Sequence, residues 1–471
     1  MAKTTQLVVI GGGPGGYTAA FLAADLGMEV TLIDEAPNPG GVCLYRGCVP
    51  SKALLHVAKV VTDARESRTW GVDFGEPTID VERMRGWKNE VITRLTGGLG
   101  QLRARREVTY ISGRAELLGP KSVRVSSLDG ASTEVAFEHA ILATGSRPSL
   151  PLRFQVESDR IWDSTRALDV PSLPRSLLVV GGGYIGLELG SVYATMGSDV
   201  TLVEMADGLL PGADRDLTTV VQRRLSEICR EVLLETKVIS LAEDGDGVKV
   251  TLEGDSVGEC DRYFDRVLVA VGRVPNSDIP GLDRTGVRLD GSGFVIVDGH
   301  RCTDEPTIFA IGDLVGEPML AHKASHEARV AVNRLAGQSA MVRPAVIPAV
   351  VFTEPEVAWC GLTEGQARIN SRSVQICRYP WVASGRAATL GQSVGVTKLI
   401  VDAESELVLG VGIVGTGAGE LIAEAVLAIE MEATVSDLRM CVHPHPTLSE
   451  TLMEAADVFF GQSTHLYRPK R

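Results

Sequence analysis

The length and composition of this chain indicate a globular protein with more than one domain. Its 471 residues exceed the roughly 250–300 residues that one hydrophobic core organises, and typical domain sizes predict about three domains. Hydrophobic residues make up 44% and charged residues 23%, which excludes a disordered chain. The excess of 60 acidic over 46 basic residues gives a net charge of −14. This charge excludes nucleic acid and anionic membranes as expected partners, because both require a basic surface.

The uncharged stretch from Thr4 to Ala24 is long enough to span a membrane, but it is not a continuous apolar helix. The glycine-rich segment at positions 11–16 divides it into a short strand and a helix. Only one lysine and four apolar residues precede these glycines, so no signal peptide is expected. We therefore expect a cytoplasmic protein without a membrane contact, in which scattered cysteines remain thiols.

The chain opens with a strand, a glycine-rich turn and a helix. Leu7–Ile10 is an apolar run typical of a buried parallel strand. The turn Gly11-Gly12-Gly13-Pro14-Gly15-Gly16 follows at once, and residues 17–26 are predicted to form a helix. A second strand over residues 30–33 ends in Asp34, eighteen positions after the last glycine.

The same arrangement recurs in the middle of the chain. An apolar run over residues 177–180 leads into Gly181-Gly182-Gly183-Tyr184-Ile185-Gly186, and residues 185–196 are predicted to be helical. The strand over residues 200–203 is followed by Glu204, again eighteen positions after the last glycine. An internal repeat of this kind predicts two copies of one structural unit.

Each G-x-G-x-x-G turn has a chemical purpose. Its first glycine permits the tight turn, its second admits a pyrophosphate to the backbone, and its third allows close packing of helix on strand. The helix N-terminus offers N–H donors to the phosphates, and the acid accepts hydrogen bonds from a ribose. We therefore predict an α/β chain with two Rossmann-like dinucleotide-binding domains. The predicted contacts are Gly11, Gly13, Gly16 and Asp34 in the first unit, and Gly181, Gly183, Gly186 and Glu204 in the second.

The second cofactor is predicted to be NAD. The Glu204 carboxylate pairs with a ribose 2′-hydroxyl and repels a 2′-phosphate, and residues 205–210 contain no cation. Both units are expected to close with a further strand and loop, at residues 140–148 and 267–276. Pro148 and Pro275 are the expected boundaries, and residues 148–174 are interpreted as a linker leading into the second unit.

Two of the eight cysteines, Cys43 and Cys48, stand apart from the others. Pro50 suits the first turn of a helix that continues over residues 53–61, which places Cys48 at the N-terminus of that helix. The helix dipole and Lys52 then favour the thiolate. A zinc site lacks a second pair of ligands nearby, and a structural disulfide does not suit a reducing compartment. The pattern favours a redox-active pair beside a bound dinucleotide.

The segment at residues 40–52 strongly resembles the G-G-x-C-x-x-x-G-C-x-P-S-K motif of the pyridine nucleotide–disulfide oxidoreductases. The resemblance continues at residues 307–313, 318–323 and 443–450 and covers nearly the whole chain. Within the family, the chain looks like the NAD-linked flavoproteins that oxidise dihydrolipoamide. Those proteins serve the 2-oxo acid dehydrogenase complexes and the glycine cleavage system.

This resemblance implies the cofactors and the domain order. FAD would occupy the first unit and NAD the second, and a C-terminal α+β domain would form a homodimer. The implied domains are 1–149 and 274–347 for FAD, 150–273 for NAD and 348–471 for dimerisation. Besides the glycines and acids above, the implied contacts are Lys52, Thr144, Gly145, Asp313, Met319 and Ala321 for FAD, and Glu188 and Gly272 for NAD. Glu188 is also expected to pair with Lys52 beside the flavin.

The resemblance further implies a relay of electrons. Dihydrolipoamide would reduce a Cys43–Cys48 disulfide, with Cys43 in the mixed disulfide and Cys48 nearest the flavin, from which hydride passes to NAD. His445, between two prolines, would take up the thiol proton at the disulfide of the other subunit, and Glu450 would orient it. Residues 447–450 also match a capping box for a helix starting near residue 448. His443 is expected to be structural, and no metal site is predicted.

Two departures from the family and two alternatives remain open. Tyr45-Arg46 replaces the usual Asn-Val, and Arg46 is expected to lower the thiol pKa further; Asp34 stands where glutamate is commoner. The first alternative is a related NAD(P)H-dependent flavin reductase of another disulfide, and the second is a non-enzymatic nucleotide sensor or scaffold. Expected partners are lipoyl domains and the acyltransferase core, whose basic binding segment the acidic surface would attract.

Overall fold

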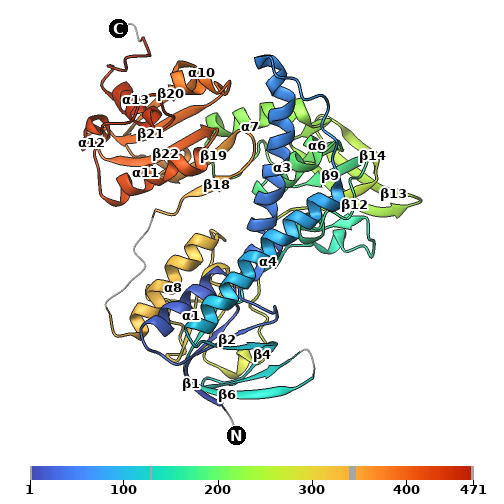
Figure 1. Ribbon diagram of the computed structural model, residues 1–471, viewed down its shortest axis with the longest axis vertical. Helices are drawn as coiled ribbons and strands as arrows, with labels where there is room; N and C mark the ends of the chain where they lie inside the picture. The colour runs from blue at the N-terminus through green and yellow to red at the C-terminus, as the bar shows by residue number, and fades with distance from the viewer. Residues whose placement is uncertain (1–2, 128–129, 339–345, 468–471) are drawn as a thin grey trace.

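The computed structural model describes residues 3–127, 130–338 and 346–467. These residues form three lobes, with the long helices α3 (Cys48–Glu66) and α4 (Val81–Arg105) between them (Figure 1). Among the described residues, no helix combines the length and apolarity needed to cross a membrane.

The first lobe is a sheet whose parallel part runs in the order β3-β2-β1-β6-β17. Strand β6 also pairs antiparallel with β5, and β5 with β4. Helices α1 (Pro14–Asp25) and α8 (Ala321–Leu335) pack together against the sheet, so a late segment of the chain completes the first unit. The strands are β1 (Lys3–Ile10), β2 (Val30–Asp34), β3 (Thr109–Ser112), β4 (Arg114–Gly119), β5 (Ser122–Ser126), β6 (Ser132–Leu142) and β17 (Ile308–Ala310).

The second lobe contains a parallel sheet in the order β11-β10-β9-β15-β8 and an antiparallel sheet of three strands. Helices α6 (Tyr184–Thr195) and α7 (Arg215–Ile228) pack on the parallel sheet. The parallel strands are β8 (Ile161–Trp162), β9 (Ser176–Val180), β10 (Asp199–Val203), β11 (Glu231–Leu233) and β15 (Arg266–Val269). The antiparallel strands are β12 (Thr236–Asp244), β13 (Gly247–Gly254) and β14 (Gly258–Phe264).

The interpretation of residues 148–174 as a linker is wrong in its centre. Strand β8 joins the edge of the parallel sheet, and helix α5 (Ser164–Leu168) follows it. Trp162 anchors this segment, because its side chain is only 1% exposed and packs in the core of the second lobe. Ser146–Pro148 (β7) and Arg273–Pro275 (β16) form a two-stranded ribbon that ties the first two units together.

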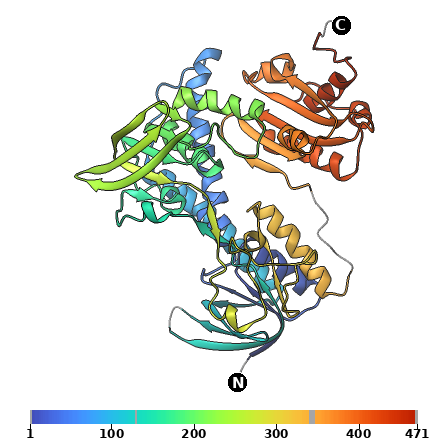
Figure 2. The same cartoon turned by 180° about the vertical axis from the view of Figure 1, so that it is seen from behind.

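The third lobe is an antiparallel sheet in the order β18-β19-β22-β21-β20, covered by helices (Figure 2). Its strands are β18 (Ala349–Val351), β19 (Glu356–Gly361), β20 (Val374–Pro380), β21 (Val396–Asp402) and β22 (Val408–Gly415). Its helices are α9 (Glu364–Ile369), α10 (Gly385–Thr389), α11 (Ala418–Glu430), α12 (Val435–Met440) and α13 (Glu450–Phe459). The predicted fold class, two doubly wound units and an α+β domain, is confirmed.

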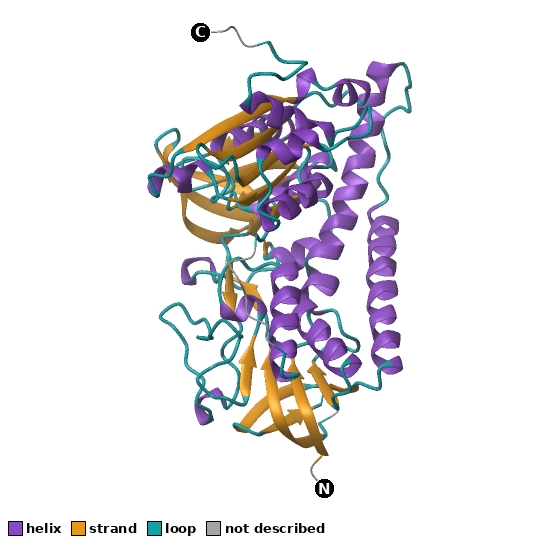
Figure 3. Cartoon of the chain, turned by 90° about the vertical axis from the view of Figure 1, so that its left-hand side faces the viewer, coloured by secondary structure: helices purple, strands orange, loops and turns teal. Residues whose placement is uncertain are grey.

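The lobes share a hydrophobic core rather than meeting only at polar surfaces. One buried cluster contains Leu54 of α3, Leu187 of α6 and Leu217 of α7, together with Val357 and Val414 of the third sheet. Figure 3 shows the sheets near the two termini as separate layers with helices alongside them. Because burial of apolar area resists separation of packed elements, the shared cluster holds the second and third lobes in one arrangement.

Candidate functional site

A cavity of about 500 Å³ lies where the first unit, α3 and α6 meet. Among the predicted site residues it is lined by Gly11, Gly13, Asp34, Cys43, Cys48, Lys52, Thr144, Gly145, Glu188, Asp313, Met319 and Ala321. Those outside it are Gly16, which lies inside the first turn, and Gly181, Gly183, Gly186, Glu204, Gly272, His445 and Glu450. The structure therefore gathers the predicted FAD contacts and both cysteines around one space.

The two glycine-rich turns have the same internal geometry. A Cβ atom on Gly16 would lie 1.7 Å from the Gly11 carbonyl oxygen, and one on Gly186 would lie 2.1 Å from that of Gly181. Gly11 and Gly181 have φ values of +106° and +113°, a region in which other residues are strained. The first and third glycines of each turn are thus required by the backbone itself.

The two acids also occupy matched positions. The Asp34 carboxylate accepts hydrogen bonds from the N–H groups of Gly12 (2.5 Å) and Ala36 (2.9 Å). Glu204 accepts from Gly182 (2.6 Å) and Ala206 (2.8 Å) in the same way. Each acid is therefore held against the turn, beside the helix N-terminus where phosphates bind.

The cavity fits a dinucleotide by its backbone as well as by its acids. The N-cap of α1 is Gly13, whose lack of a side chain leaves the N–H donors of the first turn open. Gly145 has φ +69°, and a Cβ atom there would meet nothing within 4 Å, so the cavity wall is open at that point. The Asp313 carboxylate accepts a hydrogen bond from Ser146 Oγ (2.5 Å), which in turn accepts one from Arg273 Nε (2.8 Å).

The cysteines lie on two consecutive helices. Cys43 is on the short helix α2 (Gly41–Arg46), which the sequence pattern did not predict, and Cys48 is the first residue of α3. Cys43 is half-buried and Cys48 is exposed to the cavity. A hydrogen bond from Cys43 lowers the pKa of Cys48 to about 7, and the charge of Lys52 lowers it as well.

Cys43 has the opposite tendency. Its hydrogen bond to Cys48 and its burial both raise the pKa of its thiol. Lys52 is the main cation acting on Cys48, whereas Arg46 is exposed and is not among the principal groups that shift this pKa. Among the groups with the largest effect on the pKa of Cys48, the cation is therefore Lys52 on α3 and not Arg46.

Lys52 and Glu188 are brought together, as expected from the sequence. The Lys52 ammonium donates to Glu188 at 2.9 Å, and Glu188 is only 2% exposed. Two partners of Glu188 were missed: Ser51 Oγ donates at 2.7 Å and the Phe352 N–H at 3.1 Å. Lys52 also lies 4.4 Å from the centroid of the Phe352 ring. Glu188 follows the second glycine-rich turn in sequence, but its side chain lines the cavity of the first unit.

His445 lies outside the cavity of its own chain, with its side chain 74% exposed. Its Nδ1 donates to Glu450 Oε1 at 2.9 Å, and Glu450 Oε2 accepts from the Thr447 N–H at 2.7 Å. Burial raises the pKa of the Glu450 carboxyl, but these two hydrogen bonds and the charges of His445 and His443 lower it, and the net shift is downward. The Nδ1–H bond leaves Nε2 as the nitrogen able to take up a proton.

The helix beside this pair starts later than predicted. Helix α13 begins at Glu450, and its N-cap Ser449 makes no side-chain capping bond. Only the Glu450 half of the expected capping box is present. His443 pairs instead with Glu424 at 2.8 Å and is nearly buried, an arrangement typical of a structural histidine.

This geometry describes a protein that holds two dinucleotides, one of them beside a cysteine pair. Comparison with known proteins agrees. Residues 5–328 match the family described as pyridine nucleotide-disulphide oxidoreductase, and residues 347–456 match its dimerisation domain. The chain belongs to this family. It is therefore an oxidoreductase with FAD and NAD(H) as cofactors, rather than a non-enzymatic nucleotide sensor.

Individual relatives cover the whole chain. A dihydrolipoyl dehydrogenase of Vibrio parahaemolyticus is 47% identical over 99% of this chain and 98% of its own length. The solved structure of LpdA from Mycobacterium tuberculosis has a TM-score of 0.89 at 27% identity, covering 97% of this chain and 99% of that one. The HOCl-induced flavoprotein disulfide reductase RclA from Escherichia coli has a TM-score of 0.84 at 28% identity, covering 95% and 98%.

Proposed function

We propose that this chain oxidises dihydrolipoamide to lipoamide and reduces NAD⁺ to NADH, with Cys43 and Cys48 as its redox pair. The observation that carries the proposal is the placement of Cys48 at the start of α3, beside Lys52, in the cavity of the first fingerprint. Full-length relatives named dihydrolipoyl dehydrogenase, 45–47% identical, support the same substrate. The reductase RclA, which represents the alternative of another disulfide substrate, is 28% identical.

The cysteines would exchange disulfides with the substrate. A thiolate of dihydrolipoamide attacks Cys43 in the oxidised pair, so that the Cys43–Cys48 bond breaks and Cys48 leaves as a thiolate. Its pKa of about 7 makes Cys48 the better leaving group, since low-pKa thiols leave faster. The second substrate thiol then attacks the substrate sulfur that is bonded to Cys43, and Cys43 leaves as a thiolate that takes up a proton, because its own pKa is raised. Lipoamide is released and both cysteines are reduced.

His445 would take up the proton of the attacking thiol at Nε2. Glu450 fixes the ring through Nδ1 and stabilises the imidazolium that forms. Because His445 is exposed and outside its own chain's cavity, we propose that it serves the cavity of the second subunit of a homodimer. The match to a dimerisation domain supports this arrangement.

FAD, when bound in the first cavity, supplies the two-electron chemistry that links the thiols to NAD. The Gly11–Gly16 turn and Asp34 would hold its adenosine and phosphates, and Asp313 would hold its ribityl chain. Lys52 would place a positive charge beside the ring. In the second unit, the Gly181–Gly186 turn and Glu204 would bind NAD, with Glu204 excluding the 2′-phosphate of NADP.

We further propose the wider setting of the reaction. The domains would span residues 1–149, 150–273, 274–347 and 348–471, and the substrate would arrive on lipoyl domains. The net charge of −14 supports docking on a basic segment of an acyltransferase core, an association that added salt should weaken. The location would be cytoplasmic, a reducing compartment in which scattered cysteines such as Cys229 and Cys360 remain thiols.

A steady-state assay with dihydrolipoamide tests this function. We expect NAD to be strongly preferred to NADP, and Cys48→Ser to abolish the reaction while the enzyme keeps its FAD. Cys260→Ser is the matched control, because Cys260 is a half-buried thiol in β14 outside the cavity. Activity that survives Cys48→Ser, or that requires NADP, would contradict the proposal.

A further inference from the structure

We propose that Lys398 is a positioning residue for the NAD-binding unit. It holds the N-terminus of helix α7 of that unit against the third lobe. The inference rests on the proposed function, because it assigns NAD to the second unit. Lys398 lies on β21 of the third lobe, and its side chain is 1% exposed. Its ammonium donates to Asp214 Oδ2 (2.7 Å), Asp216 Oδ1 (2.7 Å) and Glu364 Oε1 (2.9 Å). Two of these acids belong to the second lobe.

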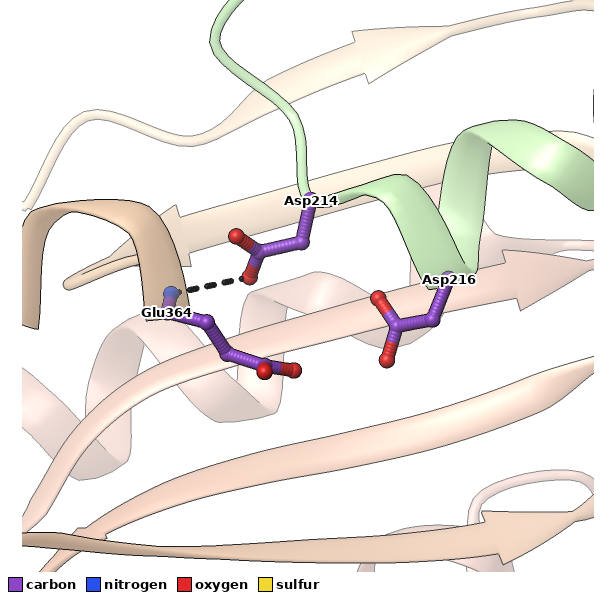
Figure 4. Close-up of side chains that lie close together, drawn as sticks. All are labelled: Asp214, Asp216 and Glu364. Carbon is purple, nitrogen blue, oxygen red and sulfur yellow. Dashed lines mark hydrogen bonds between the residues drawn. The ribbon is translucent and has the colours of Figure 1, made fainter. Parts of the chain in front are cut away.

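The three carboxylates converge from two helices, α7 and α9 (Figure 4). Asp214 and Asp216 stand at the start of α7, and Glu364 is the first residue of α9. The acids could be mistaken for a cation site, but the Lys398 ammonium already provides three hydrogen bonds and the counter-charge. Arg378 of β20 adds a second cation, donating to Asp216 at 2.6 Å and also to Glu364. Three acids and two bases leave a net charge of −1.

Asp214 serves the neighbouring lobe rather than its own helix. It is the N-cap residue of α7 but makes no capping bond there. Its two carboxylate oxygens instead accept from the N–H groups of Glu364 (3.0 Å) and Gly365 (3.3 Å). An N-cap side chain ordinarily satisfies its own helix, so this orientation favours a tether between the lobes.

Apolar packing supports the charged contact. Leu217, one turn into α7, lies against Gly412 of β22, where a Cβ atom would be 2.6 Å from Leu217 Cδ1. A side chain at position 412 would therefore displace the Leu217 side chain from its place against the sheet. The start of α7 is thus held to the third lobe by a buried charge cluster and by direct contact with the backbone of the sheet.

The tether reaches the NAD site through residues 205–213, which connect Glu204 to Asp214. Within this loop, the Leu210 N–H donates to the Gly182 carbonyl at 2.9 Å, and Leu209 packs over Gly182. At its C-terminal end, Asp214 is bound to Lys398. A loop held at these two points keeps its shape, so Lys398 stabilises the wall beside the expected ribose without touching the nucleotide.

The test compares the FAD-loaded variant Lys398→Met with wild type. We expect a KM for NAD⁺ and a calorimetric Kd for NADH that rise about tenfold, while the KM for dihydrolipoamide and kcat change less than about twofold. The control is Lys249→Met, which removes a lysine–aspartate pair within the second lobe, between β13 and β14. The control should leave both nucleotide constants unchanged. An unchanged NADH Kd in folded Lys398→Met would overturn the inference.

The double variant Asp216→Asn/Lys398→Met removes one acid and one base and so preserves the net charge of the cluster. Lys398→Met could fail to fold if the three acids repel one another. In that case the double variant tests whether the tether affects NADH binding. A raised NADH Kd supports the tether, and a wild-type Kd overturns it. Failure of the proposed function is separate: a wild type that binds NADH but does not oxidise dihydrolipoamide would refute that function alone.

Discussion

The two nucleotide-binding units are alike within their turns and different in what surrounds them. In both, the acid accepts hydrogen bonds from the residue that follows the first glycine of the turn and from the residue two positions after the acid itself. In both, the third glycine presses on the carbonyl of the first. Spacing along the chain therefore determines the turn, because every one of these contacts is local to one strand–turn–helix–strand segment.

The surroundings are built by distant segments. The first unit faces α2, α3 and α6 across a cavity that contains both cysteines. The second unit is closed on one side by the third lobe, through Lys398 and the shared apolar core. The comparison shows that the same strand–turn–helix arrangement has different neighbours in the two units: one copy is placed beside the cysteines, and the other is packed against the third lobe.

The largest effect is expected for His445, which should matter for the reaction at the cysteines and not for the reaction of NADH. His445→Gln should lower kcat/KM for dihydrolipoamide by about 10²–10⁴-fold, because the attacking thiol loses its proton acceptor. Reduction of ferricyanide by NADH, which requires no thiol, should change less than about threefold. The control is His443→Gln, which changes a nearby histidine that is hydrogen-bonded to Glu424 and nearly buried. This variant should leave both rates unchanged. Equal losses in the two assays would break the distinction between the units.

Removing the acid from each unit should separate the two cofactors. Glu204→Ala should raise the KM for NAD⁺ by about 10–100-fold, since a ribose loses a charged hydrogen-bond partner. FAD retention should remain unchanged in this variant. Asp34→Ala should have the opposite result, with weaker FAD retention in gel filtration and an unchanged NADH Kd. Crossed effects would show that the units are not independent.

A smaller effect concerns the cation beside the thiols. In the reduced enzyme, alkylation of Cys48 by iodoacetamide should rise with pH through a midpoint of about 7 and level off above it. Lys52→Met should move this midpoint upward, because the charge that favours the thiolate is lost. Arg46→Met should leave it in place. Mass spectrometry of the labelled peptide gives both curves, and a shift in Arg46→Met alone would refute the assignment.

The smallest effect distinguishes glycines needed by the fold from those needed by a ligand. Gly183 has φ −79°, and a Cβ atom added there would meet no atom within 4 Å, so Gly183→Ala should fold normally and weaken NADH binding about fivefold. Gly186→Ala should instead destabilise the protein by about 1–3 kcal/mol, because its Cβ meets the Gly181 carbonyl. Thermal unfolding and NADH titration check the pair. A destabilised Gly183→Ala would contradict this division.

Patterns of neighbouring residues predicted most of the individual strands, turns and helices of the two nucleotide-binding units. Both turns, their flanking strands, and the start of α3 near Cys48 and Pro50 lie where the spacing indicated. Helix α2 was missed because six residues are too few to show a helical period. The two-residue strand β8 was hidden in a proline-containing segment for the same reason.

Partners distant in sequence could not be predicted. Glu188 and Phe352 are 164 positions apart, and Lys398 and Asp214 are 184 apart. No periodicity joins such residues, because the tertiary fold alone brings them together. The P-S-K segment did contain a signal for Ser51, a small hydroxyl residue one position before Lys52 at the start of a helix. His445 and Glu450 were found from resemblance, and their hydrogen bond is formed within one short segment.

In the proposed reaction, reducing equivalents enter through Cys43 and Cys48. The most direct measurement adds one equivalent of dihydrolipoamide to the oxidised, FAD-loaded enzyme without oxygen, quenches with acid, and alkylates the thiols for peptide mass spectrometry. The account predicts new labelling of Cys43 and Cys48 only, and its loss when excess NAD⁺ is added before the quench. Labelling that is the same with and without dihydrolipoamide, or that appears on other cysteines, would contradict it.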